Sequence, residues 1–327
     1  MEMRKNMRSV GEVSRPLVLS RRIRVILALA IIAAFCTFAL AEDSGSDYSF
    51  KKADYWYKRG LILSGEGAYE EALKNYEKAL QAYPERAAFW DGKAAALASL
   101  SLSSKDASKF NDSLQAYDMA VKLYDDSLKS DSSDANNWYY RGLALSNKAS
   151  LMQKSEKMNI AILKEDSSSS SEILEEAIKS YEKAIEINPK YLTAWKNIGI
   201  DLYSLGRMNE SLQAYDHALA IDNNYALAWY YKGLTLYELS DYGQAVQAYD
   251  NALKTLPKDA AIWYAKGNSL YRQGNYDMAI ECYDEATKLN QSFAEAWNQK
   301  GAAYEKLGSS AIATAAFSKA KALGYSG

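Results

Sequence analysis

The chain has 327 residues and a formal net charge of −2, and 48% of its residues are hydrophobic and 24% charged. This composition is typical of a folded globular protein and not of a disordered chain. A single histidine, His217, and two cysteines leave no His/Cys zinc set and no Ser–His or Cys–His pair beyond chance. We therefore expect no metal, no cofactor and no enzymatic activity.

Residues 1–41 are predicted to be a signal peptide or a signal anchor. Seven basic residues lie in the first 24 positions, and an apolar run, 25–41, follows and ends in Ala39-Leu40-Ala41. A basic segment, an apolar core and a small-x-small site are the parts of a secretory signal. The run also reaches the lower limit for spanning a bilayer. Cleavage after Ala41 and retention as a membrane anchor through 25–41 both remain open.

In either case the basic flank stays on the cytoplasmic side. The remaining chain is therefore expected to be exported, either secreted or anchored in the cytoplasmic membrane with its repeats outside. Cys36 lies in the apolar run, so the exported part holds only Cys282 and forms no intrachain disulfide. Without residues 1–41 the chain carries 32 Lys and Arg against 39 Asp and Glu, which argues against nucleic acid as a partner. Residues 42–52 are expected to form a polar linker.

Seven tryptophans then mark a repeat. Successive tryptophans are 34, 48, 57, 34, 34 and 34 residues apart, and the fourth residue after each is glycine in six cases of seven. The tryptophans are Trp56, Trp90, Trp138, Trp195, Trp229, Trp263 and Trp297, and the glycines are Gly60, Gly142, Gly199, Gly233, Gly267 and Gly301. A fixed period near 34 residues indicates an array of stacked units. We interpret these tryptophans and glycines as core residues that build the scaffold.

The unit 229–257 shows the pattern most clearly. Trp229, Gly233 and Leu236 share one helical face, and Ala245, Tyr249 and Ala252 share another before Pro257. The pattern resembles the tetratricopeptide repeat, in which W-x2-L-G-x2-Y is followed by A-x3-F and P. Its style, with motifs such as YDNALKTLP, looks like the arrays of methanogenic archaea. The resemblance implies an all-α, right-handed superhelical solenoid of seven helix-turn-helix repeats over 53–327, with units near 53–86, 87–134, 135–191, 192–225, 226–259, 260–293 and 294–327.

Units two and three are longer than the period. In unit two the second-helix pattern comes seven residues late, behind an insertion placed near Ser103–Asn111, and that helix is expected to run on through Leu128. In unit three the first helix is expected to continue to about Lys164, followed by a serine-rich loop, 166–171, and a second helix from about Glu172. Insertions in repeat proteins often map to the binding face. The alternative is that the insertions have no function and are tolerated because longer surface loops cost little stability.

The resemblance implies a concave groove lined by the first helix of each unit. The positions one, five and eight residues after each Trp are expected to be exposed there. Tyr suits peptide contact because it offers a large flat surface, a hydroxyl and few rotors. The groove candidates are Tyr139, Lys196, Tyr203, Tyr230, Tyr237, Tyr264, Asn268, Tyr271 and Asn298. The Lys and Asn pair that grips a peptide carboxylate in chaperone-binding members is not assembled, since Ile200 follows Lys196 and Tyr264 precedes Asn268.

The sequence thus predicts a non-catalytic scaffold that binds a protein or peptide in its groove on the extracytoplasmic side. A self-associating structural component of the cell envelope is the alternative, because no capping helix follows the last predicted repeat. Three N-x-S/T sequons, at Asn111, Asn209 and Asn290, are possible glycosylation sites in an exported chain. They are placed in the inserted loop, the turn of unit four and the junction before unit seven. Chance occurrence in polar turns is the alternative.

Overall fold

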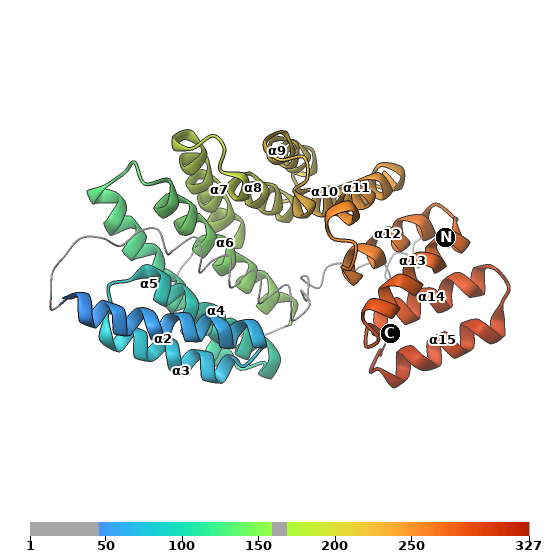
Figure 1. The fold of residues 1–327 in the computed structure, drawn as a ribbon, viewed down its shortest axis with the longest axis horizontal. Coiled ribbons are helices and arrows are strands. Elements are labelled where there is room, and N and C mark those ends of the chain that lie inside the picture. The colour runs from blue at the N-terminus through green and yellow to red at the C-terminus, as the bar shows by residue number, and fades with distance from the viewer. Residues whose placement is uncertain (1–45, 159–168, 327) are drawn as a thin grey trace, which may run out of the picture.

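The computed structural model describes residues 46–158 and 169–326, and in these ranges the chain forms 14 α helices (Figure 1). They are α2 (Ser46–Glu66), α3 (Tyr69–Ala82), α4 (Ala87–Ser104), α5 (Ala107–Ser130), α6 (Ala135–Lys157), α7 (Ser170–Ile187), α8 (Leu192–Ser204), α9 (Met208–Ile221), α10 (Ala226–Glu238), α11 (Tyr242–Thr255), α12 (Ala260–Arg272), α13 (Tyr276–Leu289), α14 (Ala294–Lys306) and α15 (Ser310–Ala322). The predicted all-α array of sequential helix pairs is confirmed.

The predicted signal, 1–41, lies outside the described residues. The predicted linker, 42–52, is wrong from Ser46 onward, because α2 already begins there. None of the helices that the structure describes is long and apolar enough to cross a bilayer.

Each unit pairs an A helix, which carries the Trp, with a B helix. Every A helix contacts its own B helix and the neighbouring A helices, and each A helix after α2 also contacts the preceding B helix. No two of the described B helices contact each other. An array whose A helices touch and whose B helices are apart curves toward the A helices. Figure 1 shows the resulting arch, which runs from α2 at one end to α15 at the other. The A helices therefore form the concave layer.

Glycine lets the two helices of a pair approach closely. The glycine four residues after Trp lies beneath the ring of a B-helix aromatic residue, and a Cβ atom added to Gly233 would lie 2.5 Å from the Tyr249 ring. Such a distance is well inside van der Waals contact, so no larger residue fits without movement. The rings above these glycines are those of Tyr76, Tyr181, Tyr215, Tyr249, Tyr283 and Phe317.

The tryptophans tie each A helix to the turn that precedes it. All seven are half-buried, and most of them pack against the buried core clusters. From the second unit onward each indole Nε1 donates to the backbone carbonyl six residues earlier, with the Trp229 bond to Asn223 O at 2.8 Å. The six carbonyls lie in the turns between units. The Trp thus satisfies a turn carbonyl and covers the junction with its ring.

The insertion in unit two lengthens both helices of the pair. α4 has 18 residues and α5 has 24, compared with 13 and 14 in the regular pair α10 and α11. Only residues 105 and 106 separate α4 from α5, so the predicted loop at 103–111 is wrong. Asp106 caps α5, its side chain accepting from the amides of Ser108 and Lys109. The predicted run of α5 through Leu128 is correct.

Unit three is also elongated. α6 extends to Lys157, and its predicted continuation to Lys164 falls outside the described residues. α7 begins at Ser170, close to the predicted Glu172, behind the N-cap Ser169. Ser169 and Glu172 form a capping box, in which each side chain accepts from the backbone amide of the other residue.

Candidate functional site on the concave face

The tyrosines one residue after Trp pack between repeats. Tyr230 is only 7% exposed, and Tyr139 and Tyr264 are half-buried. Their rings lie 5.7 to 6.1 Å from the B-helix tyrosines of the same units, Tyr181, Tyr249 and Tyr283. The expectation that this position is exposed is therefore wrong for Tyr230 and only partly right for Tyr139 and Tyr264. Adjacent aromatic rings at the unit junctions draw these side chains inward.

The tyrosines eight residues after Trp, Tyr203, Tyr237 and Tyr271, are half-buried. Tyr237 packs edge-on against Tyr242, and Tyr271 packs in the same way against Tyr276, with ring centroids 5.3 and 5.2 Å apart. The Arg272 guanidinium lies 5.9 Å from the Tyr237 ring centroid and 5.1 Å from that of Tyr242. A cation over two rings holds them in place. The A helices of units four to six thus carry a row of partly exposed tyrosines.

The predicted polar groove residues lie in different settings. Asn268 accepts a hydrogen bond from the Tyr283 hydroxyl at 2.9 Å, so it supports the core ring. Asn298 is half-buried on α14. Lys196 is half-buried on α8, and burial lowers its pKa to about 8, against the opposing attraction of Asp201.

Asp201 belongs to a buried polar cluster at the junction of units three and four. It is 3% exposed and accepts from Ser146 Oγ at 2.5 Å. The same Ser146 oxygen lies 3.1 Å from the Tyr181 hydroxyl, which also accepts from Asn197 at 3.4 Å. Burial raises the pKa of Asp201 to about 7, outweighing the Ser146 hydrogen bond and Lys196.

Sequence reasoning missed Asp201, although a signal was present. Six residues after Trp, the other units carry Ile62, Ala96, Ala144, Thr235, Ser269 and Ala303, so Asp201 is the single charged residue in this column. The structure brings the predicted candidates Tyr139 and Lys196 to the same junction, since Asn197 also contacts the Tyr139 hydroxyl at 3.4 Å. The remaining candidates lie along units four to seven.

A second set of charges fastens neighbouring units together. Three residues after Trp, a lysine pairs with an aspartate of the preceding B helix, as in Lys232–Asp216 at 2.5 Å and Lys266–Asp250 at 2.6 Å. Lys300 and Asp284 form the same pair in unit seven. Each of these lysines also lies over its own Trp ring.

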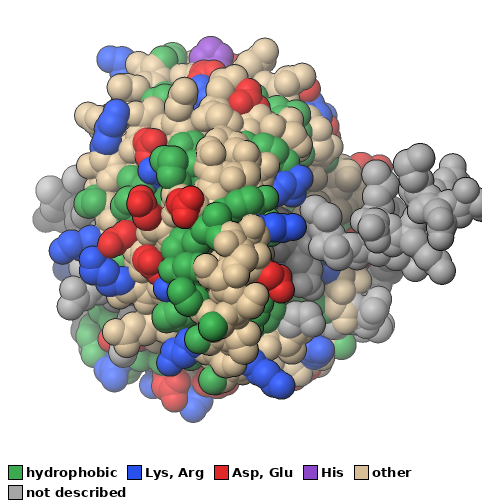
Figure 2. Space-filling model, turned by 90° about the vertical axis from the view of Figure 1, so that its right-hand side faces the viewer, with side chains coloured by type: hydrophobic (Ala, Val, Ile, Leu, Met, Phe, Trp, Pro, Cys, Tyr) green, Lys and Arg blue, Asp and Glu red, His purple; other side chains and the backbone are tan. Residues whose placement is uncertain are grey.

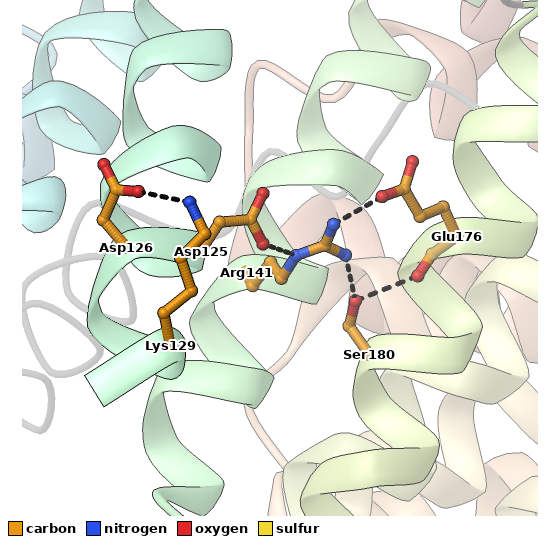
Figure 3. Close-up of polar contacts among 6 residues, drawn as sticks. All are labelled: Asp125, Asp126, Lys129, Arg141, Glu176 and Ser180. Atoms are coloured by element: carbon orange, nitrogen blue, oxygen red, sulfur yellow. Dashed lines mark hydrogen bonds and ion pairs between the residues drawn. The ribbon is translucent and has the colours of Figure 1, made fainter. Parts of the chain in front are cut away.

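Arg141 takes this position in unit three and makes the most extensive contacts of the set (Figure 3). Its guanidinium donates from Nε to Asp125 at 2.6 Å, from Nη1 to Ser180 Oγ at 2.7 Å and from Nη2 to Glu176 at 2.5 Å. Figure 3 shows it between α5 on one side and α7 on the other. The Arg141 side chain is 13% exposed. This geometry joins units two and three, and it offers no reacting group.

The residues with reactive side chains occupy structural positions. His217 is exposed on α9 and stacks on Trp195 with ring centroids 4.3 Å apart. Cys282 is a buried free thiol, and burial raises its pKa to about 11. No group of three His, Cys, Asp or Glu side chains that could hold a metal occurs among residues 46–158 and 169–326.

The three sequons lie in different environments. Asn111 is half-buried within α5, so its predicted loop setting is wrong. Asn209 is exposed in the first turn of α9 rather than in the preceding turn. Asn290 is exposed at the C-cap of α13, at the predicted junction, where its side chain accepts from Ser292.

Family models match much of the array. A model described as TPR repeat matches 201–240 and 267–308, and models described as tetratricopeptide repeat match 53–86, 174–191 and 230–277. The chain therefore contains tetratricopeptide repeats. Such repeats form scaffolds that are typically non-catalytic and bind proteins or peptides.

Individual relatives are more distant. The chain is 39% identical over 51 residues to an uncharacterized protein of Methanocaldococcus jannaschii, a match that covers 16% of this chain and 59% of that protein. Among solved structures, MamA matches with 24% identity over 46% of this chain and 88% of its own, at a TM-score of 0.45. YrrB, described as a TPR protein with an unusual peptide-binding site, matches with 19% identity over 62% and 92%, at a TM-score of 0.44. These similarities are too low to transfer a property to this chain.

Proposed function

We propose that the protein is an exported scaffold that binds an extended peptide, or a peptide-like segment of a partner protein, along its concave face. The observation that carries this proposal is the row of partly exposed tyrosines on successive A helices, including Tyr203, Tyr237 and Tyr271. The rings of Tyr237 and Tyr271 pack against neighbouring aromatic side chains, so little conformational entropy is lost when a ligand covers them.

Peptide selection against the immobilised protein tests this proposal. Selected peptides should bind Tyr237→Ala and Tyr271→Ala variants about tenfold or more weakly, because aromatic anchors carry much of the binding energy. Gln247 is exposed on the B helix α11, and Gln247→Ala is the matched control that should bind as tightly as the native chain. Equal affinity of all three variants, with unchanged melting temperatures, would place binding elsewhere.

The extracytoplasmic location is part of the proposal. It is supported by the seven basic residues ahead of an apolar run that ends in Ala39-Leu40-Ala41. A protease added outside intact cells should digest the repeats while cytoplasmic markers survive. Protection of the repeats, with degraded external markers, would contradict export. The mass of the mature chain shows whether residues 1–41 are removed.

Glycosylation depends on export. Asn209 and Asn290 offer exposed amides, whereas the half-buried Asn111 in α5 is a poorer acceptor. The intact mass of protein from its native envelope should exceed that of the bare polypeptide by whole sugar units. Substituting both exposed asparagines with Gln should remove that excess, and a mass equal to the bare chain would exclude glycans at all three sites.

Self-association is the second candidate, and the last helix favours it. Ile312 on α15 is 52% exposed and the neighbouring Leu307 is 40% exposed. Figure 2 views this end of the array and shows hydrophobic side chains gathered in a band across it. Light scattering at micromolar concentration tests the idea: oligomers that dissociate in an Ile312→Lys variant would support it, and a strict monomer would exclude it.

A further inference from the structure

Asp91 differs from its counterparts in the other repeats. It lies one residue after Trp90, where the other units carry Tyr57, Tyr139, Lys196, Tyr230, Tyr264 and Asn298. Its Oδ2 accepts a hydrogen bond from the Tyr124 hydroxyl at 2.7 Å. Its Oδ1 is enclosed and has no hydrogen-bond partner. A carboxylate with one unsatisfied buried oxygen calls for a partner, because such an atom carries the full cost of desolvation.

Tyrosine hydroxyls of three helices lie within electrostatic reach of this carboxylate. Tyr57 comes from α2, Tyr117 and Tyr124 from α5, and Tyr140 from α6, and the charge of Asp91 acts on all four hydroxyls. The rings of Tyr124 and Tyr140 stack with centroids 6.3 Å apart. The site therefore lies in the concave layer, where α4 contacts both α2 and α6.

Among residues 46–158 and 169–326, no lysine or arginine forms an ion pair with Asp91. Arg86 lies over the Phe50 ring at 5.5 Å, and Lys93 lies over the Trp90 ring at 5.4 Å. Burial raises the pKa of Asp91 to about 7, and the Tyr124 hydrogen bond only partly opposes this effect. The protein thus holds an acidic group at a place where its charge is poorly compensated.

The insertion in unit two supplies one wall of this site. Tyr124 follows the buried Tyr117 by seven residues, where the regular B helices have already reached their C-caps, Asp222, Leu256 and Asn290. The extension of α5 to Ser130 therefore places the Tyr124 hydroxyl against Asp91. This gives the insertion a role in the concave face.

We propose that Asp91 and Tyr140, together with the buried Tyr57, form a binding site for an alkylammonium group of the bound chain. The inference rests on the proposed peptide-binding function and specifies its chemistry. Aromatic faces and a carboxylate together attract an ammonium ion. Asp91 is half-buried as a residue and its Oδ1 is enclosed, so this oxygen meets a ligand only when the carboxylate rotates about its broad terminal torsion. In this site the protein supplies the negative charge and the ligand the positive charge, the reverse of a site that grips a peptide carboxylate.

A small probe tests the site directly. In a protein with 13C-labelled tyrosine rings, n-butylammonium chloride should cause saturable shifts of the Tyr57 and Tyr140 signals, whereas the neutral N-butylacetamide should not. Asp91→Asn should weaken binding about tenfold or more, since it removes the charged partner. Asp112 is exposed on the same helix as Tyr124, and Asp112→Asn should leave binding within about twofold. Absence of saturable shifts, or equal shifts in Asp91→Asn, would overturn the proposal.

Two further arms complete the test. If Asp91→Asn does not fold, as judged by its melting curve, Tyr140→Leu keeps the carboxylate and should still weaken binding; unchanged binding would contradict the aromatic role. Two peptides show which amine is bound: one has a free lysine side chain and an acetylated N-terminus, and the other has an acetylated lysine and a free N-terminus. If no amine binds, the ammonium site is contradicted but the proposed peptide binding is not, because binding that depends on Tyr237 and Tyr271 is measured separately.

Discussion

At the scale of single residues, the repeat depends on a glycine packed against an aromatic ring. In a helix, Gly costs about 1 kcal/mol relative to Ala, so its presence in six of seven units needs a packing reason. The 2.5 Å approach that a Cβ at Gly233 would make to Tyr249 provides it. From the sequence these glycines were interpreted as core residues, and the structure identifies the ring that each one contacts.

Substitution of two glycines should therefore give opposite results. Gly233→Ala should destabilise the protein by about 1–3 kcal/mol, because the added methyl group overpacks a fully buried ring. Gly243→Ala is the control, since Gly243 is in helix α11 and its Cβ would meet only Asp241 Oδ1 at 3.8 Å. That change should be neutral or stabilising by up to about 1 kcal/mol. Urea unfolding of both variants measures the sign of each change in the free energy of unfolding. A Gly233→Ala variant more stable than the native chain would contradict the packing argument.

Buried carboxylates should make stability depend on pH. The pKa of Asp201 is about 7 in the folded chain against an ordinary 3.8, so the folded state binds its proton more tightly than the unfolded state does. The contribution of Asp201 to the free energy of unfolding is therefore largest below about pH 4. It is lost as the pH rises toward 7, by about 1.4 kcal/mol per pH unit at most. Lys196, with a pKa of about 8, stays protonated across most of this window and adds little slope.

Asp201→Asn should flatten the pH dependence of unfolding between about pH 4 and 7. The amide keeps a polar partner for Ser146 without a charge that must be desolvated. Asp91 has a similarly raised pKa, so the double variant with Asp91→Asn should be flatter still. An unchanged slope in both variants, measured by urea titrations at several pH values, would mean that these carboxyls are not the groups responsible.

At the scale of helices, the sequence predicted the A and B helices of the regular units because their apolar residues follow one helical face. The insertion in unit two was misread for a physical reason. Seven residues are about two helical turns, so a lengthened helix keeps the apolar pattern in phase. The polar run around Ser103–Asp106 then resembled a loop, although only two residues form the turn. Asp201 was missed because a buried carboxylate is recognised only once its surroundings are known. Asp91 was included only among the positions expected to be exposed in the groove.

The Arg141 contacts should matter more to the junction of units two and three than an exposed ion pair. Arg141→Met should destabilise the protein by about 2 kcal/mol, since it leaves Asp125, Glu176 and Ser180 without their shared donor. Lys129→Ala is the control, because the Lys129–Asp126 pair is largely exposed and should contribute less than about 1 kcal/mol. Hydrogen exchange should show the Arg141→Met effect concentrated in α5, α6 and α7. Equal effects of the two substitutions would contradict this role.

At the scale of the whole molecule, the array is a chain of neighbours. Each helix pair contacts only the pairs before and after it, so no single core spans the protein. Stability in such arrays is the sum of unit terms and nearest-neighbour interfaces. The curvature follows from contact among A helices and its absence among the described B helices. The seven-fold repeat in the sequence predicted the number of units, whereas the burial of individual groove tyrosines depends on the rings of adjacent units.

A substitution in the middle should therefore be felt locally. Trp229→Ala removes a half-buried ring at the junction of units four and five and leaves the Asn223 carbonyl without its donor, at a cost of about 3 kcal/mol. In hydrogen exchange, α9 to α12 should lose protection first, while α2, α3 and α15 should remain close to the native chain, because they share no interface with the altered unit. Trp297→Ala, the matched change in the last unit, should shift the loss to α13 to α15. A uniform loss across all seven units in both variants would show one cooperative body and would refute the nearest-neighbour description.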